Sequence, residues 1–266
     1  MVRSLIRYAI SFTRIFFLGR FGYLLRDLSK YYRKKSEWLN LKKASLESAE
    51  SGLKNSISWL LVSQEKMEDQ GMGSFSLSNG WSTSYPETTG YIISTLLNYS
   101  RLYNDENCRQ SALNAAEWLV SIQRKSGGWQ GGRINEGRSE IVFNTGQILR
   151  GLLDAYEETG EKYFLKSVVN GADWLCDIQH PDGYWKDHAL MNRARVYDSF
   201  VSYPLLLTWK ATKDERYRDH AIRNLEWIVR KKQKSNGWFE DCDNTIKHNE
   251  RPILHTIAYT IEGLLD

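Results

Sequence analysis

Four copies of a phrase of tryptophan, leucine (isoleucine in the last copy) and glutamine divide this chain of 266 residues at nearly equal spacing. A turn with glycine and an aromatic residue follows each copy. A second phrase, rich in leucine, alternates with the first. Two motifs that share one period indicate a repeat array, in which each unit packs on its neighbours. The four copies of the first phrase are marked by Trp59, Trp118, Trp174 and Trp227, and the second phrase begins at Thr95, Gly151, Leu205 and Gly263.

Each repeat is predicted to be a pair of helices, because apolar residues recur at helical spacing in both phrases. No stretch shows the alternation of a strand. The predicted fold is all-α: an (α/α) toroid domain over residues 45–266, with four helical hairpins visible. The tryptophan-bearing helices are predicted at 45–65, 107–124, 161–180 and 215–233, and the leucine-rich helices at 88–103, 144–158, 198–211 and 256–266. Pro204 falls inside one of them, and a kink is expected there.

The connections between these helices differ in length. Long stretches lead from each glutamine to the next leucine-rich helix, whereas the return connections, such as 157–161, have only a few residues. All long loops therefore lie at one end of the array. Long loops carry function more often than short ones, so the site is expected at that end.

The segment Trp118-Leu119 to Ile122-Gln123, followed by Gly127-Gly128-Trp129, resembles the repeats of α/α-toroid proteins. These include terpenoid cyclases, protein prenyltransferases, six-hairpin glycosidases, polysaccharide lyases and uronyl epimerases. Segments 85–91 and 254–259 are similar to toroid proteins found with bacterial exopolysaccharide genes. The resemblance covers about residues 45–266 and implies the architecture, whereas a fold alone does not determine a reaction. Closed toroids of these families have more hairpins than four, so an incomplete ring, truncated at the C-terminus, is expected.

One register of the repeat places chemically active side chains directly before the residues that open the leucine-rich helices. Glu87, Phe143, Tyr197 and His255 share this register, and they are expected to meet where the helix N-termini converge. A carboxylate, a phenol and an imidazole facing one cavity can perform general acid–base catalysis. Helix N-termini also favour an anionic substrate group. The predicted catalytic residues are Glu87, His255, Tyr197, Asp198 and Tyr85.

The next register holds Thr88, Asn144, Asp198 and Thr256, which are all preferred N-cap residues. Capping would fully explain Asp198 without a catalytic role.

Tryptophan and arginine side chains in the long loops are predicted to bind substrate. Aromatic rings offer flat faces for sugars, and guanidinium groups bind carboxylates with two parallel hydrogen bonds. An acidic oligosaccharide or polysaccharide is therefore the predicted partner. The alternative for the repeating tryptophans is a wedge between adjacent hairpins. The predicted binding residues are Trp81, Trp129, Trp185, Trp238, Arg133, Arg193 and Arg195.

No metal or cofactor site is predicted. Cys108, Cys176 and Cys242 are widely spaced, and the sequence has neither a CxxC nor an HxxxH motif. Reduced, buried cysteines are expected, which favours a cytoplasmic protein.

These features predict a carbohydrate-active protein of bacterial surface-polysaccharide metabolism. It would perform acid–base chemistry of the epimerase, lyase or hydrolase type on a glycan that contains uronate. Two alternatives stay open: an isoprenoid cyclase or prenyltransferase-like protein, and a non-catalytic scaffold in polysaccharide assembly.

Residues 1–40 form a separate basic segment. Residues 1–35 contain nine arginines and lysines but only one acidic residue, Asp27, so this stretch has a net charge of +8. The longest uncharged run, 8–13, is far shorter than the roughly 20 residues that cross a bilayer. One or two amphipathic helices are predicted, with Gly19 and Gly22 weakening the middle. They are expected either to pack on the helix that follows or to contact a membrane surface or a synthase. Nucleic acid is not predicted as a partner, since no basic patch continues into the body.

Overall fold

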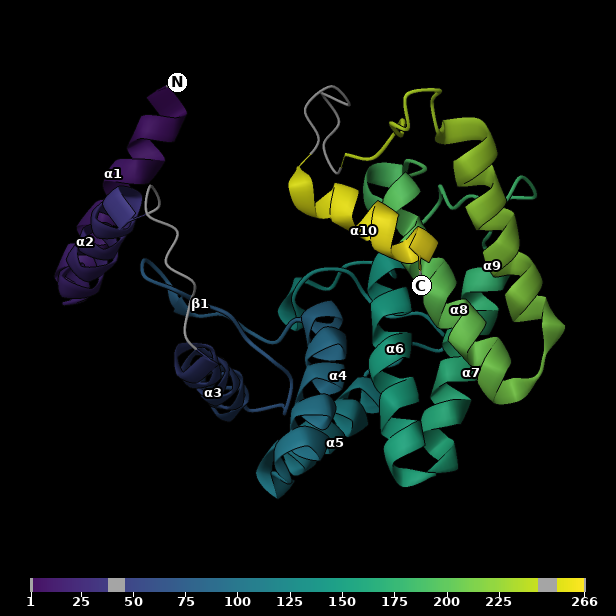
Figure 1. Cartoon of the computed structure of the whole chain (residues 1–266), viewed down its shortest axis with the longest axis horizontal. Coiled ribbons are helices and arrows are strands. Elements are labelled where there is room, and N and C mark those ends of the chain that lie inside the picture. The colour runs from purple at the N-terminus through teal and green to yellow at the C-terminus, as the bar shows by residue number, and fades with distance from the viewer. Residues whose placement is uncertain (1, 38–45, 244–252, 266) are drawn as a thin grey trace. The chain divides into compact units, whose positions relative to one another are not determined.

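The computed structural model describes residues 2–37, 46–243 and 253–265 (Figure 1). The chain forms two compact units: residues 1–67 with 73–83, and residues 68–72 with 84–266. Within the described ranges, the regular structure is helical apart from one small two-stranded sheet. The larger unit confirms the predicted all-α toroid architecture of helical hairpins.

The larger unit consists of helices that alternate between two layers. Helices α4, α6, α8 and α10 pack side by side in chain order, and α5, α7 and α9 form the second layer. Each short connection joins a helix of the first layer to one of the second, as in α4–α5, α6–α7 and α8–α9. The helices are α4 (Pro86–Tyr103), α5 (Glu106–Ser121), α6 (Val142–Thr159), α7 (Lys162–Asp177), α8 (Ser199–Thr212), α9 (Glu215–Trp227, continued by a π-helical turn, Ile228–Lys232) and α10 (Leu254–Leu265).

Glycines of the leucine-rich phrase let the helices of the first layer touch through their backbones. A Cβ atom on Gly151 of α6 would lie 2.5 Å from the carbonyl oxygen of Gly90 on α4. A Cβ atom on Gly263 of α10 would meet the backbone at Phe200 on α8. The period of the sequence therefore records points of close helix approach, where any side chain would force the helices apart.

The glycine–tryptophan turns act as wedges inside this unit. Trp129 and Trp185 are fully buried, and their indole N–H groups donate to the carbonyl oxygens of Leu119 and Leu175, at 2.7 and 2.8 Å. The prediction that these two tryptophans bind sugar is wrong, because neither ring has an accessible face.

The repeated glutamines join consecutive hairpins. Gln123 Nε2 donates to the carbonyl oxygen of Gly127 in its own turn and to that of Ser167 on the next second-layer helix, both at 2.8 Å. Gln179 repeats the arrangement with Gly183 and His220, at 3.1 and 2.9 Å. One side chain thus holds the turn and the adjacent hairpin together.

Proline at position 204 lies inside α8, which runs through it. Proline has no N–H group to donate to the carbonyl oxygen four residues earlier, that of Phe200. The Gln147 amide of α6 donates to this oxygen at 3.2 Å. A hydrogen bond between α6 and α8 therefore replaces the missing bond within the helix.

The smaller unit contains α1 (Val2–Phe17), α2 (Phe21–Glu37), α3 (Leu46–Glu65) and the antiparallel strands β1 (Phe75–Ser76) and β2 (Gly80–Trp81). The two predicted N-terminal helices are confirmed, with Gly19 between them at φ +66°. Trp81 stacks on Trp59, with ring centroids 5.3 Å apart. None of the described helices is both long and apolar enough to cross a membrane.

Candidate active site

The starts of the first-layer helices surround a cavity of about 210 Å³ in the larger unit. The structure brings the whole register of Glu87, Phe143, Tyr197 and His255 to this cavity, as the repeat predicted. The full lining is Tyr85, Glu87, Ile141, Phe143, Asn144, Leu190, Tyr197, His255, Thr256 and Tyr259.

Helices α4 and α6 begin earlier than the N-cap register implied. Tyr85 and Ile141 are the N-cap residues of α4 and α6, so Thr88 and Asn144 lie inside the first turn. Pro86 at the first position of α4 has the φ angle of a helix and needs no N–H partner. The prediction that Thr88 and Asn144 are caps is therefore wrong. From the first turn of α6, Asn144 instead forms part of the cavity wall.

Glu87 is the carboxyl group of the cavity. Its Oε2 accepts a hydrogen bond from the Tyr85 hydroxyl at 3.1 Å. Burial raises the pKa of Glu87 from its ordinary value to about 7, and the Tyr85 hydrogen bond opposes part of this rise. A carboxyl group with such a pKa holds its proton in a substantial fraction of molecules at neutral pH and can donate it.

Two tyrosines and an aromatic wall accompany Glu87. Burial, followed by the nearby charge of Glu87, raises the pKa of Tyr85 to about 12. The pKa of Tyr197 is raised above its ordinary value, first by burial and then by Asp198. Both phenols therefore stay neutral and can donate hydrogen bonds. Phe143 contacts the rings of Tyr197 and Tyr259, with centroids 5.5 and 5.2 Å apart.

Asp198 lies next to this wall but does not line the cavity. It is buried at the N-cap position of α8, as the register predicted, but its side chain makes no capping hydrogen bond. Its Oδ2 has no hydrogen-bond partner among the described residues. Burial raises the pKa of Asp198 to about 8, although Arg195 opposes the rise.

Replacing this carboxyl group is expected to stabilise the protein at alkaline pH. The unfolded chain ionises Asp198 near pH 4 and the folded chain only near pH 8, so stability is lost as pH rises between these values. Asp198→Asn cannot ionise. We expect its free energy of unfolding to exceed that of the parent by roughly 2–5 kcal/mol at pH 8 and by much less at pH 4.5, as measured by urea denaturation.

The control for this prediction is Asp187→Asn, which changes an exposed aspartate in the same loop. Its effect on stability should be small at both pH values. An equal effect of Asp198→Asn at pH 4.5 and pH 8 would show that the buried carboxyl group is not the cause.

The family follows from the sequence once the site is in place. The model of the catalytic domain of GH127 β-L-arabinofuranosidases matches residues 61–260. The chain belongs to the GH127 family. This membership places it among carbohydrate-active enzymes and favours the carbohydrate interpretation over the isoprenoid one. A comparison of this chain with curated proteins found no match.

Three solved structures with the same fold are described as carbohydrate-active proteins or as a possible member of such a family. A possible GH105 member from Salmonella enterica has a TM-score of 0.66 at 12% identity, over 97% of this chain and 81% of its own. An unsaturated glucuronyl hydrolase specific for heparin has a TM-score of 0.54 at 15% identity, over 68% and 55%. The GH76 α-mannanase BT2949 of Bacteroides thetaiotaomicron has a TM-score of 0.50 at 18% identity, and the chain spans 47% of its length. These likenesses show the shared fold.

The predicted arginines of this GH127-family chain lie outside the cavity lining. Arg195 is buried and donates from Nη1 to the backbone oxygen of Asp243. The prediction that it binds substrate is wrong, because its guanidinium is enclosed in this loop contact. Arg133 is exposed and lies 3.7 Å from the carboxylate of Glu136, and Arg193 is exposed.

The other predicted binders are also separate from the lining. Trp238 is 40% exposed on the loop after α9, and Trp81 belongs to the smaller unit. Substrate contact by these two tryptophans, and by Arg133 and Arg193, stays a prediction.

Some lining residues carry no signal in the sequence. Leu190 comes from a 3₁₀ turn (Leu190–Asn192) in a long loop, and no repeat relates it to the other residues. Arg138, by contrast, lies in the long loop before α6, at the end of the array where the sequence predicted the site. It is close enough for its positive charge to lower the pKa of Tyr85, although it also pairs with Glu136 at 2.6 Å.

Proposed function

We propose that this chain is a glycoside hydrolase that uses Glu87 as its proton donor. The observation that carries the proposal is a carboxyl group with a pKa near 7 in the cavity where first-layer helices begin. The family membership supports hydrolysis among the reaction types that the residues alone leave open.

The proposed step cleaves the bond between the anomeric carbon and the leaving oxygen. Glu87 transfers its proton to that oxygen as the bond breaks. Water attacks the anomeric carbon, and the His255 imidazole accepts the proton that the water loses. Tyr85 holds the Glu87 carboxyl group through its hydrogen bond at 3.1 Å, and Tyr197 offers a neutral donor to a sugar hydroxyl.

The proposed substrate is a glycan with acidic sugars, in bacterial surface-polysaccharide metabolism. Several features of the cavity support a negatively charged sugar. The N-termini of α4, α6 and α10 contribute residues to its lining, and helix N-termini carry partial positive charge. The Arg138 charge acts on Tyr85 from nearby. The volume of about 210 Å³ is smaller than the roughly 300–1,000 Å³ of drug-sized sites, which fits a single sugar ring.

A panel of glycosides with and without a uronate carboxylate tests this proposal. We expect release of new reducing ends, with acidic substrates turned over faster than their neutral counterparts. His255→Ala should lower turnover by about 10²-fold or more if the imidazole accepts the proton from water. The control is His180→Ala, which changes an exposed histidine on a loop outside the cavity.

Each result separates the parts of the proposal. Faster turnover of neutral substrates would contradict the acidic substrate class. Equal turnover by His255→Ala and the parent would remove His255 from the mechanism. A panel without any cleavage would overturn the hydrolase proposal.

A further inference from the structure

The N-terminal hairpin of α1 and α2 exposes large apolar side chains to an unusual degree. Tyr8, Phe16 and Phe17 are 73%, 59% and 81% exposed. The expectation that the apolar face of the N-terminal segment packs on the first tryptophan-bearing helix, α3, is therefore wrong for these three residues. Helix α2 covers this face only in part, through Phe21, whose ring centroid lies 5.8 Å from that of Phe16.

Basic side chains occupy the face of α1 opposite Phe16, and Phe17 lies at the edge of this face, next to Arg14. Arg7 and Arg14 are seven residues apart, which is nearly two helical turns, so they lie on one side of the helix. Both are exposed. A helix with one apolar and one arginine-bearing face is typical of segments that lie in the plane of a membrane interface.

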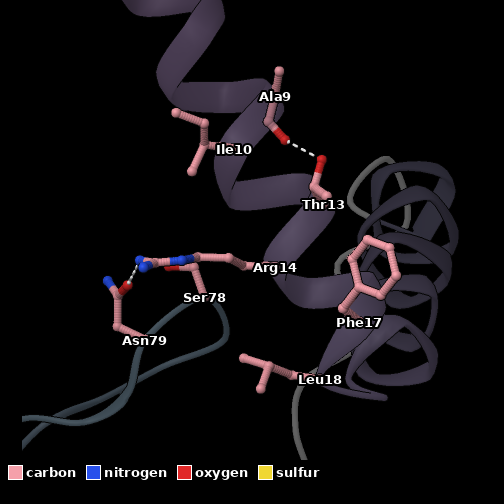
Figure 2. A pocket seen from close by; sticks show the side chains of 8 residues that line it. All are labelled: Ala9, Ile10, Thr13, Arg14, Phe17, Leu18, Ser78 and Asn79. Atoms are coloured by element: carbon pink, nitrogen blue, oxygen red, sulfur yellow. Dashed lines mark hydrogen bonds between the residues drawn. The ribbon is translucent and has the colours of Figure 1, made fainter.

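A groove adjoins this surface within the smaller unit. It has a volume of about 740 Å³ and lies between α1 and the turn that joins β1 to β2 (Figure 2). Apolar side chains of Ile10, Phe17 and Leu18 line one part of it. Arg14 reaches across from α1 and donates from Nη1 to Asn79 Oδ1 at 2.9 Å. An apolar wall beside a cationic group matches the two parts of an anionic phospholipid.

A second arginine holds the turn against the helical hairpin. Arg20, between α1 and α2, donates from Nη1 to the carbonyl oxygen of Leu77 at 3.1 Å. Its guanidinium also lies over the ring of Phe75, 5.1 Å from the centroid. Hydrogen bonds from Arg14 and Arg20 therefore hold the β1–β2 turn beside α1, and this contact forms the groove.

We propose that α1, α2 and this groove dock the protein on the surface of an anionic phospholipid bilayer. The charge of residues 1–35, +8, is attracted to acidic headgroups and opposes docking of a second copy through the same surface. The exposed aromatic and aliphatic side chains enter the headgroup and acyl boundary. Arg14 binds a lipid phosphate, and the side chains of Ile10 and Phe17 contact the acyl chain.

Co-sedimentation with vesicles tests the proposal on the full chain. We expect binding to vesicles of equal phosphatidylserine and phosphatidylcholine, and little binding to phosphatidylcholine alone. Raising the salt from about 0.1 M to about 1 M shortens the screening length from about 10 Å to about 3 Å, and should release most of the protein.

Two sets of variants examine the basic and apolar parts separately. Arg7→Gln with Arg14→Gln should weaken binding about 30-fold, since each basic group near an anionic leaflet contributes about fivefold. Phe17→Ser should weaken it about tenfold through lost burial of the ring. The matched control is Lys162→Gln with Lys166→Gln, which removes two exposed charges from α7 and should bind like the parent.

Three results would overturn the proposal. The first is failure of the parent chain to bind anionic vesicles. The second is binding by both α1 variants that equals that of the control. The third is a Phe17→Ser variant that melts many degrees below the parent, or that dissociates a dimer, because the apolar face would then pack within the protein or on a second copy.

Discussion

Glu87→Gln is expected to lower the turnover of a cleavable glycoside by about 10²–10⁴-fold, the usual contribution of a general acid. Glutamine keeps the shape of the side chain but has no proton to give to a leaving oxygen. At neutral pH the variant should be at least as stable as the parent, because the amide avoids the burial of a charge. Initial rates on a substrate identified from the glycoside panel give the measurement. Turnover within threefold of the parent would exclude Glu87 as the proton donor.

The pH profile identifies the group that acts. The donor must be protonated, and burial raises the pKa of Glu87 to about 7, so the rate should fall as pH rises through about 7. Tyr85→Phe removes the hydrogen bond that opposes this rise. The alkaline limb should then move to higher pH while the rate at low pH changes little.

A matched control accompanies both variants. Glu157→Gln changes an exposed glutamate near the other end of α6, and it should keep the rate and the pH profile of the parent. A pH limb that stays in place in Tyr85→Phe would mean that another group controls it.

Repeat spacing predicted the fold well because it reflects contacts between neighbouring units. Gly151 and Gly263 recur where one first-layer helix touches the one before it, and Gln123 and Gln179 recur where one side chain joins two hairpins. Equivalent positions in the repeat also predicted that Glu87, Phe143, Tyr197 and His255 would line one cavity. A residue that performs the same packing task in each repeat leaves a signal that can be read without a structure.

The remaining site features were not predictable, because they depend on burial rather than on position in the repeat. Asp198 and Arg195 have the residue types of functional groups, yet both are enclosed beside the cavity. The sequence does not distinguish an arginine at a surface from one that holds a loop backbone. Leu190 reaches the cavity from a long loop whose course no period determines.

Removing one of the buried wedges is expected to have the largest effect on stability. Trp129 is fully buried, and its indole N–H donates to the carbonyl oxygen of Leu119 at 2.7 Å. Its ring lies so close to Gly171 of α7 that a Cβ atom there would be 2.7 Å from it. Trp129→Ala should lower the free energy of unfolding by about 3–5 kcal/mol, since it leaves a large cavity between hairpins.

The repeat itself provides the comparison for this wedge. Trp238 occupies the same place in the last glycine–tryptophan turn but is 40% exposed, so Trp238→Ala should cost less than about 1 kcal/mol. Trp129→Phe should fall between the two, because it keeps most of the ring but leaves the Leu119 oxygen without its donor. Urea denaturation monitored by circular dichroism measures all three. The two tryptophans share their position in the repeat but differ in burial. Equal losses of stability for Trp129→Ala and Trp238→Ala would therefore show that burial between adjacent hairpins does not determine how much this tryptophan stabilises the fold.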